Sequence, residues 1–237
     1  MDTKNIKIVG HRGAAGYAPE NTLLSFQAAV DSNCDKVEMD IRVTRDGHAV
    51  VIHDATVNRT TDGKGPVSAL TLADLKKLDC GQGQKIPTFQ EVADFCKNRI
   101  PMIVELKEFG ASEGVSRILH EDGLASSSLV ISFNSDILIE MKEIQPGIRL
   151  GLVFRKPLSK SRLESIWRFS EETPLDYICP RSDALNAHMV SEAHAKGLRV
   201  YAYHVNSRRI FRKMAKCRVD EIGTDYPRRF TQPPFRS

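Results

Sequence analysis

The chain has 237 residues and a mass of 26.5 kDa, with 41% hydrophobic and 27% charged residues. This composition is sufficient for one large or two small globular domains and excludes a disordered or collagen-like protein. The formal net charge of +4 is too small to indicate a nucleic-acid-binding protein. Five scattered cysteines without a C-x-x-C spacing argue against a secreted disulfide framework and a zinc ribbon.

Apolar runs and local charge bear on location and partners. No segment approaches the ~18 consecutive apolar residues of a membrane-spanning helix, and the first apolar run is too short for a signal peptide. Residues 199–237 hold ten basic and three acidic residues, which we interpret as a solvated helix face. We therefore expect a cytoplasmic protein that acts on a small molecule, with no nucleic-acid partner and no stable membrane anchor.

Short apolar runs alternate with segments of helical periodicity along most of the chain, which predicts βα units and a parallel sheet. Strands are expected at residues 6–9, 36–40, 49–53, 102–106, 129–133, 149–154, 177–179 and 199–203. Eight strands in a chain of this length favour a (β/α)8 or TIM barrel. A further run at 222–224 could be a ninth strand, and an open doubly wound sheet is the alternative fold.

The clearest helix begins after Asn21 or Thr22 and places Leu23, Phe26 and Val30 on one face. Further helices are expected at residues 88–98, 135–144, 160–171, 187–195 and 208–216. Only residues 41–48 separate the second predicted strand from the third, with a turn signal at Asp46-Gly47. No helix fits there, so we expect one barrel helix to be missing.

Residues 54–87 are rich in glycine and proline and contain one short helical stretch at 71–78. The segment is too long for an ordinary βα loop and too weakly apolar for an independent domain. We expect a small insertion after the third strand, at the C-terminal face of a single barrel domain that spans residues 1–237.

Polar or charged side chains lie within or directly after five of the predicted strands. They are His11, Arg12, Glu38, Asp40, His53, Glu105, Lys107 and Asn206. A buried strand has little other reason to hold such residues, and the C-terminal ends of barrel strands build active sites. Each residue taken alone is also compatible with a solvated sheet edge or a buried salt bridge.

Alternation along a strand places Glu38 and Asp40 on one face, and Glu105 on the same face as Lys107. If these faces meet at the barrel mouth, the three carboxylates repel one another unless a cation joins them. Oxygen ligands suit Mg²⁺ or Ca²⁺ better than zinc. The alternative is a salt-bridge cluster with Arg12 and Lys107.

A divalent ion beside Arg12 and Lys107 would form a concentrated positive site suited to a phosphate group. Two histidines from different strands, His11 and His53, supply the other parts that phosphodiester cleavage needs. One would take a proton from the attacking hydroxyl, and the other would donate one to the leaving alkoxide. The alternative is a pair of core histidines bonded to the backbone.

The segments HRGAAGYAPENTLLSFQAAV, VEMDIRVTRDGHAVVIHD, VELK, VYAYHVN and VDEIGTDYP, in this order from His11 to Pro227, resemble the glycerophosphodiester phosphodiesterase family. The resemblance implies a (β/α)8 barrel that hydrolyses glycerophosphodiesters to glycerol 3-phosphate and an alcohol with the help of a divalent cation. The roles that it implies are catalysis for His11 and His53, metal binding for Glu38, Asp40 and Glu105, phosphate contact for Arg12 and Lys107, and a cleft lining for Phe133 and Tyr203.

The chain departs from the family pattern at two places. It has Asn33-Cys34-Asp35 where the family usually has Gly-Ala-Asp, and Tyr203-His204 where the family usually has Trp-Thr. These departures leave the preferred alcohol open. One alternative function is phospholipase-D-like cleavage of lysophospholipids or sphingolipids, and another is a non-catalytic barrel that binds a phosphorylated ligand. The odd number of cysteines argues against the first, and the complete catalytic set argues against the second.

Overall fold

The computed structural model describes residues 6–233. Eight parallel strands form a barrel, which closes because β1 pairs with both β2 and β9. In chain order the barrel strands are β1 (Lys7–Gly10), β2 (Lys36–Val43), β4 (Met102–Leu106), β5 (Leu129–Ser132), β6 (Arg149–Phe154), β7 (Tyr177–Pro180), β8 (Arg199–Ala202) and β9 (Glu221–Thr224). The predicted TIM barrel is confirmed.

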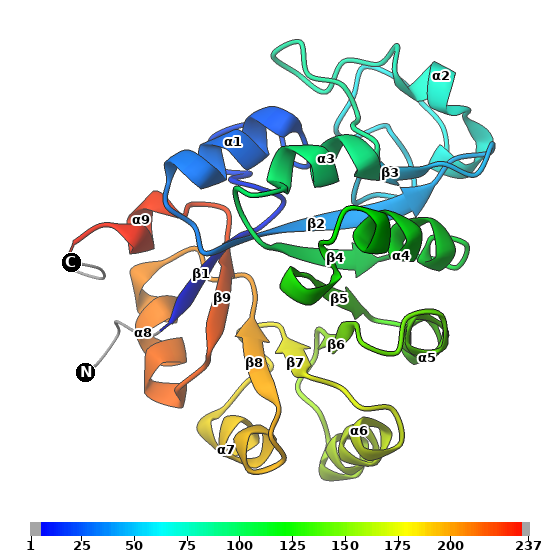
Figure 1. The fold of residues 1–237 in the computed structure, drawn as a ribbon. Helices are drawn as coiled ribbons and strands as arrows, with labels where there is room; N and C mark the ends of the chain where they lie inside the picture. Colours follow the sequence, from blue (N-terminus) through cyan, green and yellow to red (C-terminus); the bar gives the residue numbers. More distant parts are fainter. Residues whose placement is uncertain (1–5, 234–237) are drawn as a thin grey trace.

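Helices surround the strands on the outside of the barrel (Figure 1). They are α1 (Leu23–Asp31), α3 (Phe89–Cys96), α4 (Ser112–Glu121), α5 (Ser135–Ile144), α6 (Lys160–Glu172), α7 (Ala187–Ala195), α8 (Arg208–Cys217) and α9 (Arg228–Thr231). Several begin at a side-chain cap: the side chains of Thr22, Thr88 and Ser207 each accept a hydrogen bond from a backbone amide of the first turn. Among the described residues, no helix has the length and apolar character to cross a membrane.

The third predicted strand lies outside the barrel. β3 (Ala49–Val51) pairs antiparallel with the end of β2, in the register Val43↔Ala49, and the turn contains Gly47 at a φ of 83°. The residues between them therefore form a hairpin, and α3 provides the helix between β2 and β4. The expectation of a missing barrel helix was wrong for this reason, and β9 is the strand that completes the barrel.

Residues 54–87 follow β3 and contain the short helices η1 (Val67–Ala69) and α2 (Leu72–Leu75). The segment lies beside the end of β2 and β3 (Figure 1). Its apolar side chains form a separate small cluster with the hairpin, which includes Val50, Ile52 and Val67. The insertion is thus attached to the barrel through the hairpin rather than through the barrel core.

Strand alternation divides the barrel residues between two apolar layers. On β5, Leu129 and Ile131 belong to the interior cluster, whereas Val130 belongs to the layer between strands and helices. On β2, Val37, Met39 and Ile41 all belong to that outer layer. The intervening residues of β2 therefore face the barrel interior.

Candidate active site

Three carboxylates meet inside the barrel near the C-terminal ends of β2 and β4. Glu38 and Asp40 lie on the interior face of β2, and Asp40 is the direct register partner of Glu105 on β4. Each of the three offers one oxygen, and these oxygens lie within 4.8 Å of one another. All three residues are buried, with exposed fractions of 2%, 1% and 7%. The convergence expected from the strand period is present in the structure.

Two cations contact this carboxylate cluster without balancing it. Lys107 Nζ lies 2.7 Å from Asp40 Oδ1 and 2.5 Å from Glu105 Oε1. Arg12 Nε lies 3.3 Å from Asp40 Oδ2, and the backbone amide of Arg12 donates to Glu38. No lysine or arginine side chain forms an ion pair with Glu38 among residues 6–233, so one buried carboxylate lacks a strong cationic partner.

The pKa values follow this imbalance. Burial and the neighbouring Asp40 charge raise the pKa of Glu38 to about 7. Burial alone would also raise the pKa of Asp40, but Lys107 and Arg12 hold it well below its usual range. A buried set of three oxygen donors in which one carboxylate resists ionisation is suited to a divalent cation, since an added charge would stabilise all three anions. The residues present therefore fit Mg²⁺ or Ca²⁺.

Each predicted catalytic histidine is fixed by an aspartate. His11 follows β1 directly, and its Nδ1 lies 2.7 Å from Asp225 Oδ1. His53 follows the hairpin, in which the Ile52 amide donates to the Asp40 carbonyl, and its Nδ1 lies 2.7 Å from Asp54 Oδ1. A carboxylate that accepts from Nδ1 leaves Nε2 available for proton transfer. His11 Nε2 lies 3.9 Å from Glu38 Oε2, which places it beside the carboxylate cluster.

The two imidazoles have opposite electrostatic surroundings. Burial acts to lower the pKa of His11, but the Glu38 charge and the hydrogen bond to Asp225 outweigh it, so that the pKa is raised. Burial lowers the pKa of His53, and the nearby Lys107 and Arg12 charges act in the same direction. The site therefore holds two histidines that differ in their affinity for a proton.

A cavity of about 200 Å³ opens over these groups. Its lining includes His11, Arg12, Glu38, His53, Glu105, Lys107, Phe133 and Tyr203 from the predicted set, together with Ile131, Val153, Arg155, Arg181, Tyr201 and His204. Asp40 does not line the cavity, because Lys107 and Arg12 lie against its carboxylate. The volume is suited to a small polar group rather than to a large apolar ligand.

Several residues at or near this cavity were not predicted from the sequence. Asp54 and Asp225 orient the histidines and belong to the HD and TDYP segments that carried the resemblance. Arg155 and Arg181 follow β6 and β7 directly, so the strand-end argument could have found them. Arg155 lies 4.4 Å from the Phe133 ring, which brings a third cation to the same side of the cavity as Lys107.

Asn206, noted in the sequence without a role, supports Asp225. Its Nδ2 donates to Asp225 Oδ2 at 2.5 Å, while its Oδ1 accepts from the backbone amide of Asp225. Each oxygen of the Asp225 carboxylate therefore has its own donor, one from Asn206 and one from His11. Burial raises the pKa of Asp225, but the hydrogen bonds and the His11 charge lower it to about 2, so it is ionised at neutral pH.

The model of the glycerophosphoryl diester phosphodiesterase family matches residues 11–229. The chain belongs to this family. YhdW of Bacillus subtilis strain 168 is 35% identical over 93% of this chain and 94% of its own. A glycerophosphodiester phosphodiesterase of Caldanaerobacter subterraneus subsp. tengcongensis is 30% identical over 93% of this chain and 94% of its own.

A solved structure gives the same result at the level of the fold. A phosphodiesterase of Oleispira antarctica, determined in complex with the product sn-glycerol-3-phosphate, has a TM-score of 0.86 and 28% identity, and 94% of each chain is covered. As a member of the glycerophosphoryl diester phosphodiesterase family, the chain is an enzyme that hydrolyses phosphodiesters. The family resemblance stated from the sequence is confirmed.

Proposed function

We propose that this enzyme hydrolyses glycerophosphodiesters to glycerol 3-phosphate and an alcohol by divalent-metal-dependent acid–base catalysis. Glu38, Asp40 and Glu105 would hold Mg²⁺ or Ca²⁺. The ion, when bound, supplies positive charge to the phosphoryl group. The observation that carries the proposal is that two aspartate-held histidines border the same cavity as Glu38 and Glu105 of this carboxylate cluster.

His11 and His53 divide the proton transfers between them. One accepts the proton of the attacking hydroxyl through Nε2, and the other donates a proton to the leaving alkoxide. The hydrogen bonds from Nδ1 to Asp225 and Asp54 keep each ring oriented and stabilise its protonated form. An alkoxide is a poor leaving group, so the reaction needs both transfers.

Arg12 and Lys107 would contact the phosphoryl oxygens, because both are half-buried cations at the edge of the cavity. Phe133 and Tyr203 would line the side on which the alcohol leaves. Phe133 is 37% exposed and its ring lies near both Lys107 and Arg155, whereas Tyr203 is buried and its hydroxyl donates to the Phe154 carbonyl. The substrate is therefore expected to lie with its phosphate inward and its alcohol outward.

Product analysis tests this orientation. Glycerophosphocholine, glycerophosphoethanolamine and lysophosphatidylcholine are incubated separately with the enzyme, with Mg²⁺, with Ca²⁺ and with EDTA. We expect glycerol 3-phosphate and the free alcohol from the first two, only with metal. Release of phosphocholine and free glycerol would mean that the substrate binds in the reverse orientation. Preference for lysophosphatidylcholine would favour the phospholipase-D-like function instead.

Two further substrates can show which nucleophile attacks the phosphate. Either water or the vicinal glycerol hydroxyl can attack, and the second route passes through a cyclic phosphate. Isotopically labelled water together with a 2-deoxyglycerol analogue distinguishes them, because only direct attack by water cleaves the analogue.

A further inference from the structure

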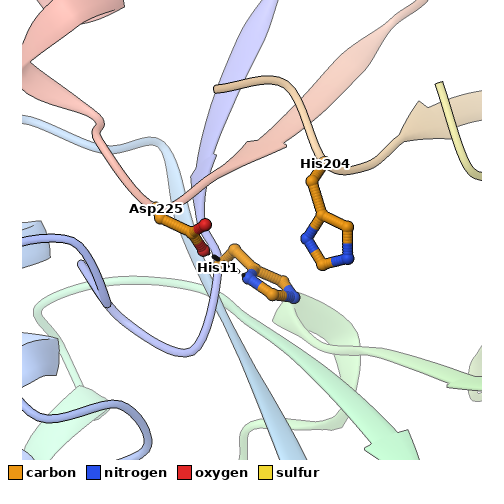
Figure 2. A group of neighbouring side chains, drawn as sticks. All are labelled: His11, His204 and Asp225. Carbon is orange, nitrogen blue, oxygen red and sulfur yellow. Dashed lines mark hydrogen bonds and ion pairs between the residues drawn. The ribbon is translucent and has the colours of Figure 1, made fainter. Parts of the chain in front are cut away.

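We propose that His11, His204 and Asp225 form a second metal site, which takes Zn²⁺ or a similar transition-metal ion and inhibits the enzyme when it is filled. Figure 2 shows the three side chains gathered at the ends of β1, β8 and β9. Each offers one ligand atom, and these atoms lie within 4.8 Å of one another. The binding part of the proposal is independent of the proposed function, whereas the inhibition rests on the proposed role of His11.

The donor set differs in kind from the carboxylate cluster. Two imidazole nitrogens and one carboxylate form a ligand set typical of zinc and other transition metals, whereas oxygen-only sets suit Mg²⁺ and Ca²⁺. Ligand atoms lie about 2.0–2.2 Å from zinc, so two that share one ion are at most about 4 Å apart. His11 Nδ1 and Asp225 Oδ1, at 2.7 Å, already satisfy this limit. The His204 nitrogen lies within 4.8 Å of the other two ligand atoms, so it has to approach them by no more than about 1 Å for all three to share one ion.

The ring nitrogens of His204 are available as metal ligands. Its ring meets the His11 ring edge-on, with 4.3 Å between centroids, and neither of its nitrogens forms a hydrogen bond or an ion pair with any residue between 6 and 233. Buried polar groups are usually paired, so an imidazole that offers its lone pair to nothing else points to a ligand. A neutral imidazole keeps one unprotonated nitrogen, whose lone pair can bind a metal ion.

The site is accessible and supported. His204 and Asp225 are half-buried and border a second cavity of about 220 Å³, which shares His11 and His204 with the cavity over the carboxylate cluster. Asn206 holds Asp225 in place through its other oxygen, as outer ligand-orienting groups do in metal sites. Arg12 also borders this cavity, and its charge is offset by Glu20 at 2.7 Å and by Asp40 at 3.3 Å.

Occupation would remove His11 from catalysis. His11 Nδ1 now donates its proton to Asp225, and an ion bound at Nδ1 would replace that proton. The neutral ring would then carry its one proton on Nε2. With one nitrogen bound to metal and the other protonated, the ring can neither accept a proton nor become the imidazolium that would donate one to the leaving alkoxide. Zinc should therefore inhibit even when Mg²⁺ saturates the carboxylate cluster.

The test uses the full chain, stripped with EDTA and then saturated with Mg²⁺. Zn²⁺ binding is measured by calorimetry, and Co²⁺ is used as a visible-absorption probe of nitrogen ligation. We expect one site in the wild type and at least ~10-fold weaker binding in His204→Thr. Two matched controls, His188→Thr at an exposed position of α7 and Glu38→Gln in the carboxylate cluster, should retain it. Melting curves confirm that each variant is folded, and His204→Gln repeats the test with a side chain closer in size.

The outcomes separate the two proposals. Equal Zn²⁺ binding by the wild type, His204→Thr and His204→Gln would overturn the site, as would loss of binding in Glu38→Gln with retention in His204→Thr. Zn²⁺ binding that depends on His204 but leaves the phosphodiesterase rate unchanged would overturn the inhibition and keep the site. Absence of phosphodiesterase activity in every metal would contradict the proposed function, while the calorimetric result would still decide the site.

Discussion

Two buried polar clusters lie at opposite ends of the barrel, and β2 contributes residues to both. At the strand starts, Lys36 Nζ lies 2.7 Å from Glu221 Oε1, and the Tyr177 hydroxyl donates to the same oxygen at 2.7 Å. Lys36, Tyr177 and Glu221 are the first residues of β2, β7 and β9. At the strand ends, Glu38, Asp40 and Glu105 share Lys107 and Arg12.

The two clusters differ in charge balance. The strand-start cluster pairs one buried lysine with one buried carboxylate, so each charge has a direct partner. The strand-end cluster has an excess of carboxylates, a Glu38 pKa of about 7, and a cavity above it. In TIM barrels the first end serves stability and the second serves catalysis. Charge balance therefore indicates which polar cluster is structural and which awaits a ligand.

The largest effect is expected from removal of the divalent ion. The excess of buried carboxylates at the strand ends should leave the enzyme inactive in EDTA, and Mg²⁺ or Ca²⁺ should restore the rate. Glu38→Gln should weaken the response to metal while leaving the melting temperature close to that of the wild type. Full activity after exhaustive dialysis against EDTA would show that the cluster is a salt-bridge network like the one at the strand starts.

Replacement of either histidine comes next. His11→Ala and His53→Ala should each lower kcat by ~10²–10⁴-fold with a smaller change in KM, because each removes one of two proton transfers. The double variant should lose less than the product of the two single effects. Steady-state kinetics on glycerophosphocholine measures this. Near-normal kcat in either variant would return that histidine to the role of a core residue.

At the strand starts, removal of a buried charge should lower the stability of the fold and leave the catalytic rate unchanged. Glu221→Gln leaves the Lys36 charge buried without its partner, so we expect the free energy of unfolding to fall by ~3–5 kcal/mol while kcat in the folded enzyme is unchanged. Lys36→Met should act in the same way. The double variant Lys36→Met/Glu221→Gln should recover part of the loss, since no isolated charge remains. Additive losses in urea unfolding would mean that the pair is not coupled.

The aspartates that orient the histidines should have a smaller effect than the histidines themselves. Asp54→Asn and Asp225→Asn keep the shape of each side chain but remove the charge that stabilises the protonated ring. We expect a ~10–100-fold lower kcat with little change in KM. The pH profile of kcat should shift in the same variants, because the pKa of the attached histidine falls when its anionic partner is removed. An unchanged profile would limit these aspartates to a packing role.

Much of the strand-end cluster could be predicted because a strand alternates. Once β2 is placed in a barrel, Glu38 and Asp40 must share one face of the strand. Glu105 then joins them because it lies on the adjacent strand β4, opposite Asp40. The orienting residues could not be predicted in this way. Asp225 is 214 residues from His11 and reaches it only because β9 closes the barrel against β1. That pairing is a property of the closed barrel rather than of any local sequence.

The errors in the predicted fold also arise where long-range packing, and not local sequence, decides the structure. β3 and β9 are both short apolar runs, and only the antiparallel pairing of β3 with β2 removes it from the barrel. Helix α4 was not predicted from the sequence. Its N-cap residue, Ala111, has no side chain that can accept a hydrogen bond from the first turn, and that turn contains Gly114, which has a low helix propensity. Its apolar face, with Val115 and Leu119, becomes evident only when it packs on the barrel.

The smallest effect is expected at the outer edge of the strand-end site. The centre of the Phe133 ring lies 4.4 Å from the Arg155 guanidinium and 5.9 Å from Lys107 Nζ. Phe133→Ala should raise KM about twofold to fivefold and leave kcat unchanged, which corresponds to the ~0.5–1 kcal/mol of an exposed cation–π contact. Because we propose that the alcohol leaves on this side, the increase should depend on the alcohol, and a comparison of glycerophosphocholine with glycerophosphoethanolamine measures it. A Phe133→Leu variant is the matched control for apolar contact without a π face. An equal loss for both substrates in both variants would mean that Phe133 only shapes the loop after β5, whereas a fall in kcat would place the ring against the reacting phosphate.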